Sequence, residues 1–120
     1  MNNQGKISMD WGGIFDILAI LNVKVNLCLG DKKDQSIYNF QKLSKEIKDQ
    51  LGDFIYSQIM GSDEYKKLYD SNLKTFHKVG EAKQSTGLAR EVDICNQDRF
   101  VKKNSLQQKF FGSDISEVKV

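Results

Sequence analysis

The chain contains no proline in its 120 residues, and this absence constrains the fold more than any other feature. Proline interrupts helices, because its ring removes a backbone donor and clashes with the preceding turn. Apolar residues also recur at intervals of three and four along most of the sequence, which is the period of an amphipathic helix. The sequence therefore predicts an all-α fold, a bundle of about four helices arranged as two antiparallel helical hairpins.

Glycine residues indicate the limits of the first two helices. The first is expected to begin near Asp10 or Gly12 and to end at Gly30, followed by a polar turn over residues 31–34. The second is expected over residues 36–51, with Gly52 ending it. The first helix is apolar on both sides, which places it at the centre of the bundle or at a subunit interface.

The second half of the chain is expected to hold two further helices. Residues 54–60 are apolar and fit either a short helix or an extended segment, and the helix is preferred. Ser62 is expected to cap a third helix that ends near residues 84–87, and residues 87–110 are expected to form the fourth. The two ends, residues 6–9 and 115–120, alternate apolar and polar residues and could pair as short strands. The apolar stripes of these two helices hold Tyr65, Leu68, Tyr69, Phe76 and Val79, and then Leu88, Val92, Cys95, Leu106 and Phe110.

Composition limits the classes of protein to consider. The length suits one domain over residues 1–120, and 39% hydrophobic with 28% charged residues is ordinary for a globular protein. A net charge of +2 provides no basic field for nucleic acid. The apolar run in the first helix is interrupted by charged and amide residues, so no membrane span is expected. Cys28 and Cys95 are expected to be buried free thiols in the cytoplasm, since no secretion signal is recognised.

Several polar residues stand where the helical period calls for apolar ones. On an ideal wheel Arg99 lies at the centre of the fourth helix's apolar face, with Asn96 and Lys103 at its edge, and Asn72 interrupts the apolar face of the third helix. Three interpretations remain open. The residues could form a satisfied internal network, with Arg99 bonded to Asn72, Asn96, nearby acids or main-chain carbonyls. They could form a pocket for a phosphate or carboxylate, or Arg99 could reach a second subunit.

The first helix carries two unusual charges, Asp16 and Lys24, about two turns apart. An ion pair with another helix is expected there rather than catalysis. No catalytic residue, cofactor or metal site is expected. His77, the single histidine, has no nucleophile pattern around it, and the chain lacks a Gly-rich phosphate loop, a zinc motif and a serine nucleophile motif. All-α nucleotide pyrophosphatases need two acidic pairs on adjacent helices, and only Glu46 with Asp49 offers one.

Three segments, GGIFDILAILNVK, LYDSNLKTF and LAREVDICNQDRFVKKNSLQ with a terminal SEVKV, resemble an uncharacterised family of small bacterial proteins often encoded among lipopolysaccharide and other surface-glycan genes. The resemblance follows the order and approximate spacing of most of the chain. It implies an all-helical fold and a surface-glycan context, but no reaction. The positions that it singles out fall on Asp16, Lys24, Asn72, Phe76, Asn96, Arg99 and Lys103.

The chain lacks acidic residues at positions where members of that family carry them. The family's acidic pair falls on Val79 and Gly80, its acid before Lys24 falls on Asn22, and its closing tyrosine is replaced by Val120. If those acids bind a metal or substrate in the family, this chain is expected to lack that capacity.

Two functions follow as hypotheses. The first is a non-enzymatic helical interaction module that forms a homodimer through its first helix, with Asn72, Asn96 and Arg99 as a structural network. The second is a protein that binds a small anion, such as a sugar phosphate or nucleotide sugar, as an accessory in surface-glycan metabolism. Arg99 and Lys103 would then hold the anion, and Asn72 or Asn96 would orient it.

Overall fold

The computed structural model describes residues 10–82 and 89–112, and all regular structure in these ranges is helical. The expected all-α class is therefore confirmed. The expected termini at residues 6–9 and 115–120, the loop at 84–87, and Leu88 lie outside the described residues. The described ranges hold five helices, not about four: α2 (Trp11–Leu27), α3 (Gly30–Leu51), α4 (Asp53–Met60), α5 (Asp63–Ala82) and α6 (Ala89–Phe111).

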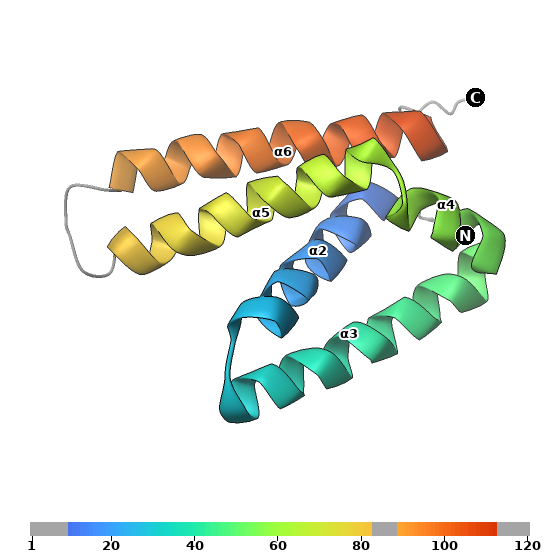
Figure 1. Ribbon diagram of the computed structural model, residues 1–120. Coiled ribbons are helices and arrows are strands. Elements are labelled where there is room, and N and C mark those ends of the chain that lie inside the picture. Colours follow the sequence, from blue (N-terminus) through green and yellow to red (C-terminus); the bar gives the residue numbers. More distant parts are fainter. Residues whose placement is uncertain (1–9, 83–88, 113–120) are drawn as a thin grey trace, which may run out of the picture.

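Helix α2 is the central element of the fold. It packs against α3, α5 and α6, whereas α3 packs mainly on α2 and on the short α4. Figure 1 shows α5 and α6 side by side in opposite directions, with α2 between that pair and α3. The apolar character of α2 on both sides therefore has an explanation within a single chain.

The two ends of α2 differ in how well local rules predict them. The helix is capped by Asp10, whose carboxylate accepts a hydrogen bond from the backbone N–H of Gly13 at 3.0 Å. Its other end was expected at Gly30, and this was wrong, because α2 stops at Leu27.

Gly30 begins the next helix instead of closing the first one. It has a φ of +63°, which allows the chain to reverse after the two non-helical residues Cys28 and Leu29. The polar turn expected over residues 31–34 is thus the first turn of α3, which begins six residues before the expected Ser36. Asp31 is favoured there, since a helix N-terminus attracts negative charge.

The later boundaries agree better with the sequence. Gly52, with a φ of +88°, ends α3 as expected, and the helix preferred for residues 54–60 is confirmed as α4. The expected cap of α5 is also confirmed, since the Ser62 hydroxyl oxygen accepts a hydrogen bond from the backbone N–H of Tyr65 at 3.1 Å.

The hydrophobic core gathers at one end of the molecule. All five helices contribute to it, and the Trp11 and Phe111 rings stack beside it with centroids 5.6 Å apart. Further along α5, Phe76 and Val79 are each 37% exposed, so the expected apolar stripe of α5 is buried only in its first half. The buried residues of the core are Phe15, Leu18, Ala19, Ile47, Tyr56, Ile59, Tyr65, Leu68 and Leu106.

Candidate functional site

A cluster of polar side chains joins α2, α5 and α6 at the edge of the core. Its centre is Asp16 of α2, which is only 8% exposed. One carboxylate oxygen accepts a hydrogen bond from the Asn72 side-chain amide at 2.8 Å, and the other lies 3.3 Å from a guanidinium nitrogen of Arg99. Arg99 also donates to the side-chain oxygen of Asn96 at 3.2 Å. Four of the residues singled out from the sequence therefore meet in one place.

Close packing of α2 on α6 sets the position of Asp16. Gly12 lies one turn before Asp16, and a Cβ atom added to it would stand 2.9 Å from the backbone oxygen of Lys103. The Gly12 N–H donates to the Gln107 side-chain oxygen at 2.6 Å, which satisfies a donor that α2 itself leaves free at its first turn. The next turn of α2 brings Asp16 level with Arg99, because the two helices run in opposite directions along this contact.

The cluster is satisfied internally. Asn72 is 4% exposed and shares its amide N–H groups between Asp16 and the Leu68 backbone oxygen, at 2.8 and 3.0 Å. The carboxylate balances the guanidinium charge, so the group is neutral as a whole. A buried charge is costly unless it is paired and hydrogen-bonded, and here it is both. This arrangement matches the interpretation of the polar residues as an internal network. The carboxylate that accepts from Arg99 is, however, Asp16 of α2 and not one of the acids near Arg99 in the sequence.

A second polar contact joins α5 to α6 beside the first. The Ser71 hydroxyl donates to Asp98 at 2.7 Å, and Lys102 forms an ion pair with the same carboxylate at 3.1 Å. The hydrogen bond from Ser71, aided by Lys102, lowers the pKa of Asp98 below its ordinary value against a smaller opposing effect of burial. The sequence interpretation missed Ser71 and Asp98. The Asp98–Lys102 spacing of four residues was the available signal.

The side chains of the remaining two candidate residues take no part in the hydrogen bonds of the cluster. Lys103 places its ammonium group 4.9 Å from the centroid of the Phe100 ring, a cation–π distance. Lys24 lies in the last turn of α2, where a positive charge is favourable to the helix dipole. Neither contributes a contact to the Asp16 carboxylate.

The cluster offers little for catalysis. It contains no nucleophile and no free base, and both charged groups are already paired with each other. Within residues 10–82 and 89–112, no three His, Cys, Asp or Glu side chains are grouped so that they could hold a metal ion. His77 is exposed and contacts the Phe76 ring edge-to-face. Cys28 and Cys95 are free but partly exposed, so the expectation that both are buried was wrong.

No helix in the described part of the chain is long and apolar enough to cross a membrane. Comparisons with protein-family models, with curated proteins and with solved structures found no match to the chain.

Proposed function

We propose that this protein is a non-enzymatic helical interaction module that forms a homodimer. The observation that carries the proposal is the exposed apolar surface of α6 that Ile94, Phe100 and Val101 form; Ile94 and Val101 share one stripe on the outer side of the helix, and Phe100 lies about 100° around the helix from Val101. These side chains are 58%, 58% and 55% exposed. At 100° per residue, Ile94 and Val101 lie about 140° and 160° around the helix from Arg99, on the side away from the core.

The stripe suits contact between two copies of the same surface. Ile94 and Val101 are seven residues apart, so two α6 helices packed in opposite directions about a two-fold axis would set Ile94 of each copy against Val101 of the other. Gln97 would lie near the axis. Aromatic and aliphatic side chains that become buried at such a contact supply most of its stability.

This proposal moves the dimer contact from α2 to α6. The packing of α2 within one chain already covers much of its apolar surface, although Ile17 remains 53% exposed. The polar cluster around Asp16 would then be structural. The surface-glycan context stays part of the proposal and rests only on the resemblance of the sequence, and the cytoplasmic location rests only on its composition.

The test is the mass of the protein in solution, measured by light scattering or sedimentation at tens of micromolar. We expect twice the 13.7 kDa of one chain. A double substitution, Ile94→Glu with Val101→Glu, is expected to give a monomer with unchanged helical content. The matched control is Phe54→Glu, on α4, where an even more exposed aromatic side chain is replaced and no change in mass is expected. A wild-type protein that stays monomeric would refute the proposal.

Binding of a small anion at Arg99 and Lys103 is the less supported function. An incoming phosphate or carboxylate would compete with Asp16 for Arg99, and the carboxylate would lose its charged partner. The Lys103 ammonium group lies over the Phe100 ring. A sugar phosphate at a hundred times its dissociation constant should add about 2.7 kcal/mol of stability, so a clear rise in melting temperature would revive this function.

A further inference from the structure

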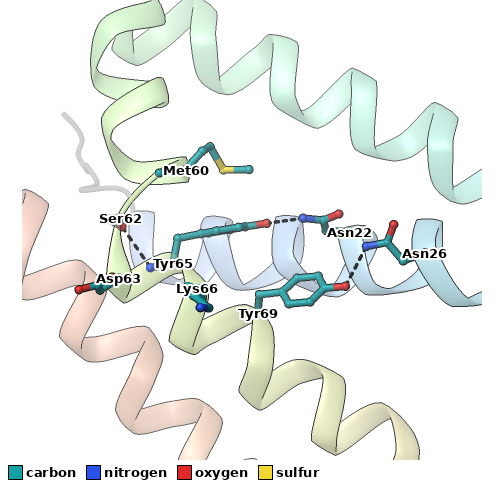
Figure 2. Close-up of a pocket in the computed structure, with 9 residues that line it drawn as sticks. Asn22, Asn26, Met60, Ser62, Asp63, Tyr65, Lys66 and Tyr69 are labelled. Carbon is teal, nitrogen blue, oxygen red and sulfur yellow. Dashed lines mark hydrogen bonds between the residues drawn. The ribbon is translucent and has the colours of Figure 1, made fainter.

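A groove between α2 and the start of α5 holds two matching pairs of polar side chains. Asn22 donates from its side-chain amide to the Tyr65 hydroxyl at 3.1 Å, and one turn later Asn26 donates to the Tyr69 hydroxyl at 2.8 Å. Figure 2 shows both amide nitrogens turned toward their tyrosines. The groove has a volume of about 500 Å³ and is also lined by Met60, Gly61, Ser62, Asp63 and Lys66.

Each pair keeps unused hydrogen-bonding capacity. The amide oxygen of each asparagine accepts no hydrogen bond from the described residues, and its second N–H and the tyrosine hydroxyl hydrogen are also free to donate. Burial raises the pKa of Tyr65 to about 12, so its hydroxyl stays protonated and keeps a hydrogen to donate. The groove thus presents two sets of polar groups, each made of one asparagine amide and one tyrosine hydroxyl. Each set offers hydrogen-bond donors and an acceptor.

The spacing of the two sets matches that of an extended polypeptide. Asn22 and Asn26 are one helical turn apart, a rise of about 6 Å for four residues. In an extended chain, residues whose N–H and C=O groups point the same way recur every second residue, about 6.6 Å apart. A side-chain amide can accept from a backbone N–H and donate to a backbone C=O at once. Asp63 and Lys66, the two charged residues of the groove, have opposite signs.

From this repeat we propose that the Asn22–Asn26 groove binds an extended, uncharged peptide segment through its main chain. Asn22 and Asn26 would bond alternate residues of the peptide, and the tyrosine hydroxyls would hold the two amides in place. The α6 stripe lies on another surface, so this site stands or falls independently of the proposed homodimer.

The test follows the side-chain amide signals of Asn22 and Asn26 in a ¹⁵N correlation NMR spectrum. The probe is a neutral, acetylated and amidated hexapeptide of alternating threonine and valine at millimolar concentration. We expect both signals to shift in a saturable way. A depsipeptide of the same sequence, whose central amides are esters without an N–H, is expected to bind roughly tenfold more weakly, the loss typical of one or two hydrogen bonds.

Asn26→Leu is the informative variant, because Asn26 is exposed and its loss leaves the core intact. It should weaken peptide binding by roughly tenfold, whereas the control Asn104→Leu, an exposed amide on α6, should leave it unchanged. Circular dichroism of both variants checks that they fold. Absence of a shift with the hexapeptide, or equal binding by the depsipeptide or by Asn26→Leu, would overturn the proposal. Shifts with maltotriose but not with the peptide would also overturn it, and would identify the groove as a site for neutral sugars.

Discussion

Replacing Arg99 with methionine tests the polar cluster most directly, because it removes the charge and keeps the apolar stem. Asp16 would then hold a negative charge at 8% exposure, with only Asn72 as a side-chain partner. At the observed 3.3 Å, two unit charges attract by roughly 5 kcal/mol in an effective dielectric constant of 20. Desolvation offsets much of this attraction, and removing one partner of a fully buried pair costs about 3–5 kcal/mol.

The Arg99 side chain is 29% exposed, so solvent screens its ion pair with Asp16. The expected loss of stability is therefore smaller than for a fully buried pair. We expect Arg99→Met to lower the free energy of unfolding by about 2–3 kcal/mol. Asp16→Asn is expected to cost about 1 kcal/mol, since the arginine left behind can reach water and still has Asn96.

The assay is urea unfolding of the wild type, both single variants and the double variant, followed by circular dichroism. The double variant is expected to be more stable than the sum of the single losses implies, by about 1–2 kcal/mol, because the two side chains contact each other. Strictly additive losses would show that the ion pair does not contribute. An Arg99→Met protein as stable as the wild type would refute the structural role of Arg99 and favour a binding role.

Three further predictions concern Gly12 and Ser71, which lie beside the cluster, and the Ser62 cap of α5. Gly12→Ala is expected to lower the free energy of unfolding by about 1–3 kcal/mol, because the added Cβ would meet the Lys103 backbone oxygen at 2.9 Å. The measurement is urea unfolding, and a variant more stable than the wild type would contradict the close packing of α2 on α6. Ser71→Ala is expected to raise the pKa of Asp98, followed by NMR of the carboxyl carbon. The folded-state pKa of Asp98 is lowered, so this carboxylate stabilises the folded protein above its unfolded pKa of about 4, and that stability is lost as the pH falls through the folded value. The Ser71→Ala variant should therefore lose less stability on acidification than the wild type does. Ser62→Ala removes the N-cap of α5 and is expected to cost about 1 kcal/mol in the same unfolding assay.

Local sequence signals predicted most of the secondary structure. The Ser62 cap and the Gly52 stop each depend on residues a few positions away, so they can be recognised without knowing the fold. Gly30 shows the limit of this reasoning, because a glycine with positive φ can close one helix or open the next. The choice depended on how α3 packs back on α2, which places Asp31 in a helical turn and not in a loop.

The candidate site was predictable in part. The helical wheel selected Asn72 and Arg99, and the apolar surroundings of the first helix selected Asp16, since burying such a group unpaired is costly. Neither could pair Asp16 with Arg99, which lie 83 positions apart in the chain. The wheel also placed Arg99 at the centre of a buried face, whereas it lies at the edge of the core with its side chain 29% exposed.

The sequence by itself determined that this chain is helical, where several of its helices are capped, and which polar residues must find partners. These properties depend on backbone chemistry and on the helical period, which act over a few residues. Only the tertiary structure decided that α2 is central, that Asp16 joins Asn72 to Arg99, and that Asn22 and Asn26 face Tyr65 and Tyr69 across a groove. Those contacts join residues 43 to 83 positions apart, and periodicity assigns a residue to a face of its helix but does not specify which helix packs against that face.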